Sequence, residues 1–179
     1  MTSASRFIHY VLLIALMCGF AASQSATQSV FSQGEVRYGT YFNGRFSYAV
    51  AVPLSHLQPQ GEASEGTQVF ASPGGEELRV SGSAEALGGS LATAYAIVSQ
   101  NAPGKEVTYN VVREDWFVVS GFEGEAVFYT RAMVHPESGA YLSFTLRYDR
   151  SLKPLFDPIT EVVSRSFRAL ETDRQVEAD

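Results

Sequence analysis

The stretch from Lys105 to Tyr148, KEVTYNVVREDWFVVSGFEGEAVFYTRAMVHPESGAYLSFTLRY, decides the fold of this chain. It alternates runs of β-branched and aromatic residues with short segments rich in Gly, Pro, Asp and Glu. Such runs predict β-strands, here Val107–Val112, Trp116–Ser120, Glu125–Val134 and Tyr141–Tyr148. Because connections this short join only antiparallel neighbours, the stretch predicts a four-stranded meander.

Two hairpins are predicted before the meander. Glu35–Phe42 and Arg45–Val52 flank Asn43-Gly44, a pair typical of a type I′ turn, in which both central residues take positive φ. Gln68–Ala71 and Leu78–Ser81 flank a turn rich in Pro and Gly. These hairpins add up to four strands to the meander, each paired antiparallel with its neighbour in the sequence.

Two amphipathic helices are predicted around the meander. The first lies in Ala84–Gln100, with Ser90–Gln100 as its firmer part, and the second lies in Leu152–Leu170. Asp157 and Pro158 suit the N-cap and first helical position of the second helix, although an earlier helical turn is equally compatible with the sequence. The apolar stripe of the second helix is Leu155, Ile159, Val162, Val163, Ser166 and Phe167.

The register of the last hairpin determines which side chains share a face. Placing Arg131 opposite Thr145 keeps its charge away from the apolar face that carries Phe144, whereas a one-residue slip would bury that charge unpaired. We therefore predict the first register. It gathers an aromatic and cationic surface, which with the single tryptophan forms the candidate binding site: Tyr129, Arg131, Tyr141, Arg147 and Trp116. Trp116 has two readings, a core anchor of a central strand or an exposed platform.

The predicted fold class is α+β, with one antiparallel sheet of about six to eight strands packed with two helices. The order of the aromatic Asn-Gly hairpin, the Val-Phe-x-Ser-Pro-x-Gly hairpin, the late Trp-Phe-Val-Val-Ser-Gly strand and the C-terminal helix ending in Arg-Ser-Phe-Arg resembles small secreted bacterial proteins with a PsbP-like fold. The resemblance covers Val36–Phe167. It implies an α/β/α sandwich and a role in binding or assembly, and it transfers no catalytic residue.

The N-terminus predicts export. Arg6 precedes the 14 apolar residues Phe7–Phe20, and small residues follow. This is the pattern of a cleavable signal peptide. The apolar segment is shorter than the ~20 residues that a helix needs to span a bilayer. We assign residues 1–23 to the signal peptide, 24–34 to a flexible lead-in, 35–170 to one domain and 171–179 to a charged tail. A membrane-tethered chain that keeps its leader is the alternative.

Composition limits the chemistry. The chain has 179 residues, a net charge of −6 and scattered charges, which argues against a nucleic-acid partner. Cys18, the one cysteine, lies in the predicted leader, and Met17 before it is not the small residue that a lipoprotein signal needs. Cleavage would therefore leave a mature chain without a lipid anchor, disulfide or cysteine nucleophile.

No pattern of catalytic or metal-binding residues stands out. His56 and His135 are the histidines outside the leader, and neither has metal-ligand spacing, so we interpret both as surface histidines. We predict no cofactor and no metal. The function predicted is a periplasmic or secreted, non-enzymatic module that binds a protein or small ligand of the cell envelope. The alternative is a small exported hydrolase that uses one histidine with a turn carboxylate, such as Glu114 or Glu123.

Overall fold

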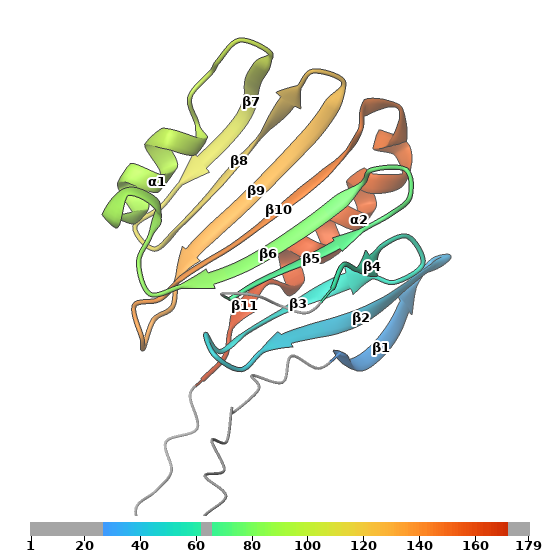
Figure 1. The fold of residues 1–179 in the computed structure, drawn as a ribbon, viewed down its shortest axis with the longest axis horizontal. Coiled ribbons are helices and arrows are strands. Elements are labelled where there is room, and N and C mark those ends of the chain that lie inside the picture. The colour runs from blue at the N-terminus through green and yellow to red at the C-terminus, as the bar shows by residue number, and fades with distance from the viewer. Residues whose placement is uncertain (1–26, 62–65, 172–179) are drawn as a thin grey trace, which may run out of the picture.

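The computed structural model describes residues 27–61 and 66–171 (Figure 1). The predicted leader, and the predicted tail apart from Glu171, lie outside these residues. In the described part of the chain, the strands form one antiparallel sheet of seven strands and a second of four. No helix among the described residues has the length and apolar character needed to cross a bilayer.

The seven-stranded sheet contains the predicted meander. Its strand order is β4-β5-β6-β10-β9-β8-β7, so the four meander strands lie side by side in sequence order. Strand β6 continues the sheet beyond the meander, because it pairs with β10 on one side and with β5 on the other. Strands β5 and β6 form the predicted Pro-Gly hairpin. The bounds are β4 Gln58–Pro59, β5 Thr67–Ala71, β6 Glu77–Ser83, β7 Lys105–Val112, β8 Trp116–Glu123, β9 Ala126–Val134 and β10 Tyr141–Asp149.

The first predicted hairpin lies in the separate four-stranded sheet, not in the main one. This sheet has the order β1-β2-β3-β11, with β1 Thr27–Gln33, β2 Val36–Asn43, β3 Tyr48–Pro53 and β11 Arg168–Ala169. All six residues of β3 are buried, because α2 and the main sheet cover this strand. Strand β1 occupies most of the segment predicted to be a flexible lead-in, and it pairs antiparallel with β2.

The turn between β2 and β3 is not the predicted type I′ turn. Asn43 pairs with Tyr48, so four residues form the loop, and the positive φ of 49° belongs to Ser47 and not to Gly44. Asn43 accepts a hydrogen bond at Oδ1 from the backbone N–H of Phe46 over 3.0 Å. This local bond closes the wider loop and directs Phe46 toward the main sheet.

The two helices lie on opposite faces of the main sheet (Figure 1). Helix α1, Leu91–Val98, begins after Ser90, whose side chain accepts the N–H of Thr93 over 3.1 Å, and it packs on β8 and β9. Helix α2, Lys153–Ser166, packs on β3, β9 and β10. The sheet with helices on both faces confirms the predicted α+β class and the sandwich arrangement.

Helix α2 begins before Asp157-Pro158. A 3₁₀ turn at Arg150–Leu152 leads directly into it, and Pro158 lies inside the helix. The buried face of α2 differs in part from the predicted apolar stripe. Phe156, Ile159 and Val163 are buried, whereas the side chain of Leu155 is 38% exposed.

The predicted register of the last hairpin is wrong by one residue. Arg131 pairs with Phe144 and Thr145 pairs with Thr130, so Arg131 lies on the apolar face. Its guanidinium is hydrogen-bonded there, because Nη1 donates to the carbonyl oxygen of Ser164 in the last turn of α2 over 2.5 Å. A helix C-terminus offers carbonyls without intrahelical partners, and it attracts a cation.

Candidate functional site

The five predicted site residues lie on two faces of the main sheet. Trp116, Tyr129 and Arg131 face α2, whereas Tyr141 and Arg147 face the side of α1, because directly paired residues share a face. The structure therefore brings the first three together and separates them from the other two.

The group on the α2 face is held by its own contacts. The guanidinium carbons of Arg113 and Arg131 lie 5.9 and 5.6 Å from the centre of the Trp116 ring. The hydroxyl of Tyr129 is hydrogen-bonded to that of Ser164 over 2.8 Å. Trp116 is half-buried beside these two cations near the sheet edge. It is therefore neither a fully buried core anchor nor an open platform.

Tyr141 belongs to a small core beneath α1. It is 9% exposed and clusters with Leu91, Phe117 and Phe128. Burial raises the pKa of Tyr141 to about 12. Its ring therefore serves packing, and it offers little surface to a partner.

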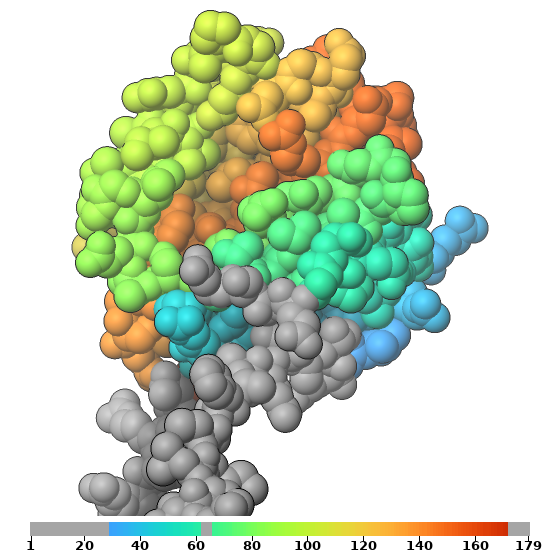
Figure 2. Space-filling model, viewed as in Figure 1, coloured from blue at the N-terminus to red at the C-terminus, as the bar shows by residue number. Residues whose placement is uncertain are grey.

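Arg147 lies on the part of the sheet that α1 leaves uncovered. Helix α1 packs mainly on β8 and β9 and reaches β10 at Tyr141, so no described helix covers β5, β6 and the rest of β10 on this side. Figure 2 shows this area as a hollow between the outer strands with α1 and the β5–β6 hairpin. We call it the open sheet face, and its residues are Thr67, Val69, Glu77, Arg79, Ser81, Glu123, Ser143, Thr145 and Arg147.

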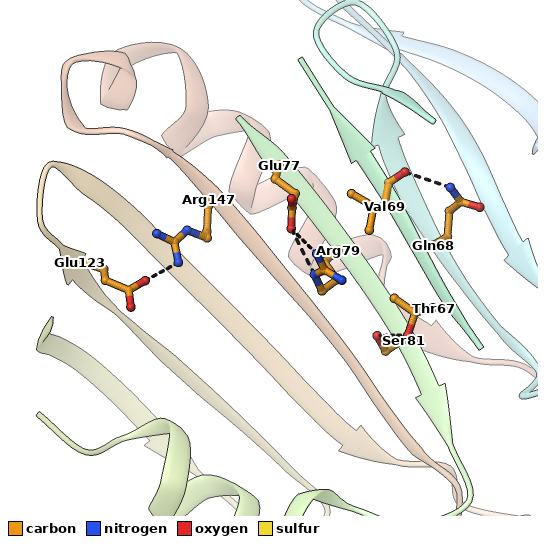
Figure 3. A network of polar contacts seen from close by, with 8 residues as sticks. All are labelled: Thr67, Gln68, Val69, Glu77, Arg79, Ser81, Glu123 and Arg147. Carbon is orange, nitrogen blue, oxygen red and sulfur yellow. Dashed lines mark hydrogen bonds and ion pairs between the residues drawn. The ribbon is translucent and has the colours of Figure 1, made fainter. Parts of the chain in front are cut away.

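The open sheet face is polar and carries balanced charge (Figure 3). Arg79 pairs with Glu77 on β6 at 3.1 Å, and Arg147 pairs with Glu123 across the sheet. Beyond the Arg79–Glu77 pair, on the side of β5, the hydroxyls of Thr67 and Ser81 bond over 2.9 Å. Exposed ion pairs of this kind contribute little to folding stability.

A cleft of about 440 Å³ lies on the opposite face, between α2 and the outer strands. Sequence reasoning identified Tyr129 among its residues and missed the others. The charges spaced one helical turn apart on α2 were visible in the sequence, but which strands they face depends on tertiary packing. The lining residues are Tyr109, Ser120, Val127, Tyr129, Tyr148, Lys153, Asp157, Thr160, Glu161, Ser164 and Arg165.

Asp157 organises the inner wall of this cleft. It accepts hydrogen bonds at Oδ1 from the hydroxyl of Tyr148 over 2.7 Å and from Nζ of Lys153 over 3.1 Å. Burial, reinforced by the bond to the Asp157 carboxylate, raises the pKa of Tyr148. Tyr148 therefore stays a neutral hydrogen-bond donor across the ordinary pH range.

His135 is a structural residue, and the prediction that it lies on the surface is wrong. Its side chain is 1% exposed. Nδ1 accepts the backbone N–H groups of Glu137 and Ser138, and Nε2 bonds to the carbonyl oxygen of Leu170 over 2.9 Å. Both ring nitrogens are thus bonded to backbone groups. The ring therefore links the β9–β10 turn to the segment after α2.

His56 lies apart from His135. It is half-buried, and its ring centre is 5.9 Å from that of Phe156. Among the described residues, no group of three or more His, Cys, Asp or Glu side chains has the arrangement of a metal site.

Comparison with known proteins identifies the fold. No protein-family model and no curated protein sequence matches the chain. The solution structure of cyanobacterial PsbP (CyanoP) from Synechocystis sp. PCC 6803 is similar, with a TM-score of 0.55 and 16% identity over 79% of this chain and 98% of that one. The Ran-binding protein Mog1p of Saccharomyces cerevisiae is also similar, with a TM-score of 0.51 and 10% identity over 76% of this chain and 97% of that one.

These likenesses define the class of the protein. It is an α+β domain of PsbP-like fold, as the resemblance in strand order and aromatic placement implied. At identities this low the comparison concerns the fold alone.

Proposed function

We propose that this chain is an exported, non-enzymatic binding or assembly module of the cell envelope, and that the open sheet face binds a protein partner. The observation that carries the proposal is the hollowed polar area over β5, β6 and β10 beyond Tyr141, which no described helix covers (Figure 2). An antiparallel sheet commonly packs one face on the core and exposes the other to water. A hollow on the exposed face offers a partner a shaped site.

The chemistry of the open sheet face suits a protein. Two ion pairs, Arg79 with Glu77 and Arg147 with Glu123, lie beside short hydroxyl side chains. Arginine, with its planar fork of donors, is favoured at protein interfaces. Of the two structural neighbours, Mog1p is described as Ran-binding, which makes protein binding a precedented use of this fold.

The histidines support a binding role over hydrolysis. A general base needs a free ring nitrogen within hydrogen-bond reach of the proton it removes. Both nitrogens of His135 are occupied by backbone groups, and His56 packs against the Phe156 ring.

Site-specific photo-crosslinking tests the proposal. A photo-reactive phenylalanine analogue placed at Arg79 or Thr145 in the tagged full-length chain should capture one protein from the native envelope. The same analogue at Leu155, which is exposed on the outer side of α2, is the matched control. Capture of the same proteins from all three positions, or of none from the sheet positions, contradicts the proposal.

Two further measurements sharpen this test. Arg79→Glu should abolish the crosslink from Thr145, because it leaves two acids side by side, whereas exchanging both charges in Glu77→Arg/Arg79→Glu should retain part of it. The mass of the mature N-terminus tests export, since cleavage near Ala21 or Ser23 is expected and a retained leader would support membrane tethering.

A further inference from the structure

The cleft beside α2 lies on the other face of the main sheet from the open sheet face, so it is a separate site. Its volume of about 440 Å³ falls within the ~300–1,000 Å³ of small-molecule pockets. One wall is α2, and the opposite side is the outer strands β7 to β10. Among its lining residues Val127 alone is aliphatic, and most of the others carry a hydroxyl or a charge.

Tyrosines from three strands line the cleft. Tyr129 and Tyr148 are anchored by hydrogen bonds to Ser164 and Asp157, so their rings and hydroxyls have fixed positions. Each of these hydroxyls still has an acceptor lone pair for a ligand. Hydroxyls of Ser120, Thr160 and Ser164 add further groups that accept as well as donate.

Tyr109 stands at the outer rim of the cleft. It lies on the edge strand β7 with 55% of its surface exposed, and its hydroxyl has no hydrogen-bond partner among the described residues. The ring contributes little to the core in this position. It does provide an aromatic surface across the cleft from α2, and an aromatic ring binds the apolar C–H face of a flat ligand.

The charges of the α2 wall cancel in pairs. Lys153 is bonded to Asp157, and Arg165 is bonded to Glu161 over 2.5 Å. An anionic ligand would meet the two carboxylates, and a cationic ligand would meet the lysine and the arginine. The wall therefore favours an uncharged ligand that both donates and accepts hydrogen bonds.

A second hollow extends the site past the Glu161–Arg165 pair. It has a volume of about 260 Å³ and is bordered by the same two residues together with Gln33, Val162 and Ser166. A linear ligand longer than the cleft can cross the exposed ion pair and reach the amide of Gln33.

From this geometry we infer that the cleft binds a neutral oligosaccharide, with one sugar ring against Tyr109 and the chain running past Glu161 and Arg165 toward Gln33. A polyhydroxylated ring has the mixed donors and acceptors that match the tyrosine, serine and threonine hydroxyls. It also has the apolar C–H face that matches an aromatic ring, and it carries no charge.

Titration calorimetry of the full chain with defined oligosaccharides tests this inference. The probes are the hexasaccharides and trisaccharides of the cellulose, amylose and chitin series, with a heparin-derived hexasaccharide as the charged comparison and the uncharged hexapeptide Gly-Ser-Gly-Ser-Gly-Ser as the alternative occupant. At least one neutral series should bind, the hexamer more tightly than the trimer, and the heparin fragment and the peptide should bind at least tenfold more weakly.

Variants locate the binding. Tyr109→Ala should weaken the binding of the hexamer at least tenfold, and Tyr109→Phe less than threefold, because Phe keeps the ring. Ile97→Ala, which removes an exposed apolar side chain from α1 on the opposite face of the main sheet, should change nothing. Gln33→Ala should weaken binding of the hexamer and spare the trimer. If no neutral series binds, if the peptide or heparin fragment binds as tightly, or if Tyr109→Ala has no effect, the inference is wrong. Crosslinking from Arg79 is an independent result.

Discussion

Nη1 of Arg131 lies 2.5 Å from the carbonyl oxygen of Ser164, so the middle of strand β9 donates to the last turn of helix α2. The guanidinium also lies over the ring of Trp116, with its carbon 5.6 Å from the ring centre. The arginine thus joins three elements, and its position on the apolar face stabilises the helix end.

Replacing Arg131 should measure the strength of this junction. We expect Arg131→Met to lower the free energy of unfolding by about 1.5–3 kcal/mol, because a hydrogen bond from a charged donor is lost and a helix carbonyl loses its partner. Urea denaturation followed by the fluorescence of Trp116 reports both the stability and the altered surroundings of the ring.

The control for Arg131 is Arg79 on the open sheet face. Arg79→Met removes an exposed partner of Glu77 and should cost less than about 0.5 kcal/mol. Equal losses for the two variants would show that the Arg131 contact with α2 adds nothing beyond a surface ion pair.

The same contact explains what the sequence could and could not predict. The meander, the Pro-Gly hairpin and both helices were predicted because each depends on residues close together in the chain. The register of Arg131 was not predicted correctly, because the carbonyl that accepts its hydrogen bond lies 33 residues away on α2. A rule against unpaired buried charge holds only when every possible partner is known.

The candidate site depended on that register. With Arg131 turned toward α2, Tyr129 joins the cleft, and Arg147 stays on the open sheet face. Tyr109 and the charges of α2 were visible as residue types, but only the packing of α2 on the sheet places them opposite each other.

His135 should prove important for stability. His135→Ala should lower the free energy of unfolding by about 2–4 kcal/mol. It removes the hydrogen bonds that the ring makes to the N–H groups of Glu137 and Ser138 and to the carbonyl of Leu170, and it leaves a cavity. His135→Asn should cost less, since its side-chain oxygen can accept the same turn N–H groups without reaching Leu170. Thermal and urea unfolding of both variants check this order, and a fully stable His135→Ala would refute the structural role.

Gly82 fixes the contact between the two sheets. A Cβ at this position would lie 2.6 Å from atoms of Phe46, so the β2–β3 loop packs directly on the backbone of β6. Gly82→Ala should therefore lower stability by roughly 1–3 kcal/mol.

A double-mutant cycle tests the cause of that loss. If the clash with Phe46 is responsible, Gly82→Ala should cost much less in a Phe46→Ala background than in the natural chain. If the stability losses of Gly82→Ala and Phe46→Ala simply add, the cost of Gly82→Ala arises within strand β6 and not from the clash with Phe46.

Alkaline pH should destabilise the protein through its buried tyrosines. Burial raises the pKa of Tyr141 from 10.0 to about 12, and the pKa values of Tyr48 and Tyr148 are raised as well. Between pH 10 and 12 the folded chain therefore keeps protons that the unfolded chain has lost. Folding stability is fully present below pH 10 and declines as the pH rises through this window.

Urea midpoints from pH 7 to 11.5, with tyrosinate absorbance recorded on the same samples, measure the alkaline decline. The midpoint should stay level up to about pH 9.5 and then fall, and the buried tyrosines should ionise only as the chain unfolds. Tyr141→Phe removes one of the groups responsible, so its midpoint should fall less steeply above pH 10 than that of the natural chain. An equally steep fall in this variant would show that Tyr141 ionises without unfolding, and its burial beneath α1 would then not account for the alkaline loss.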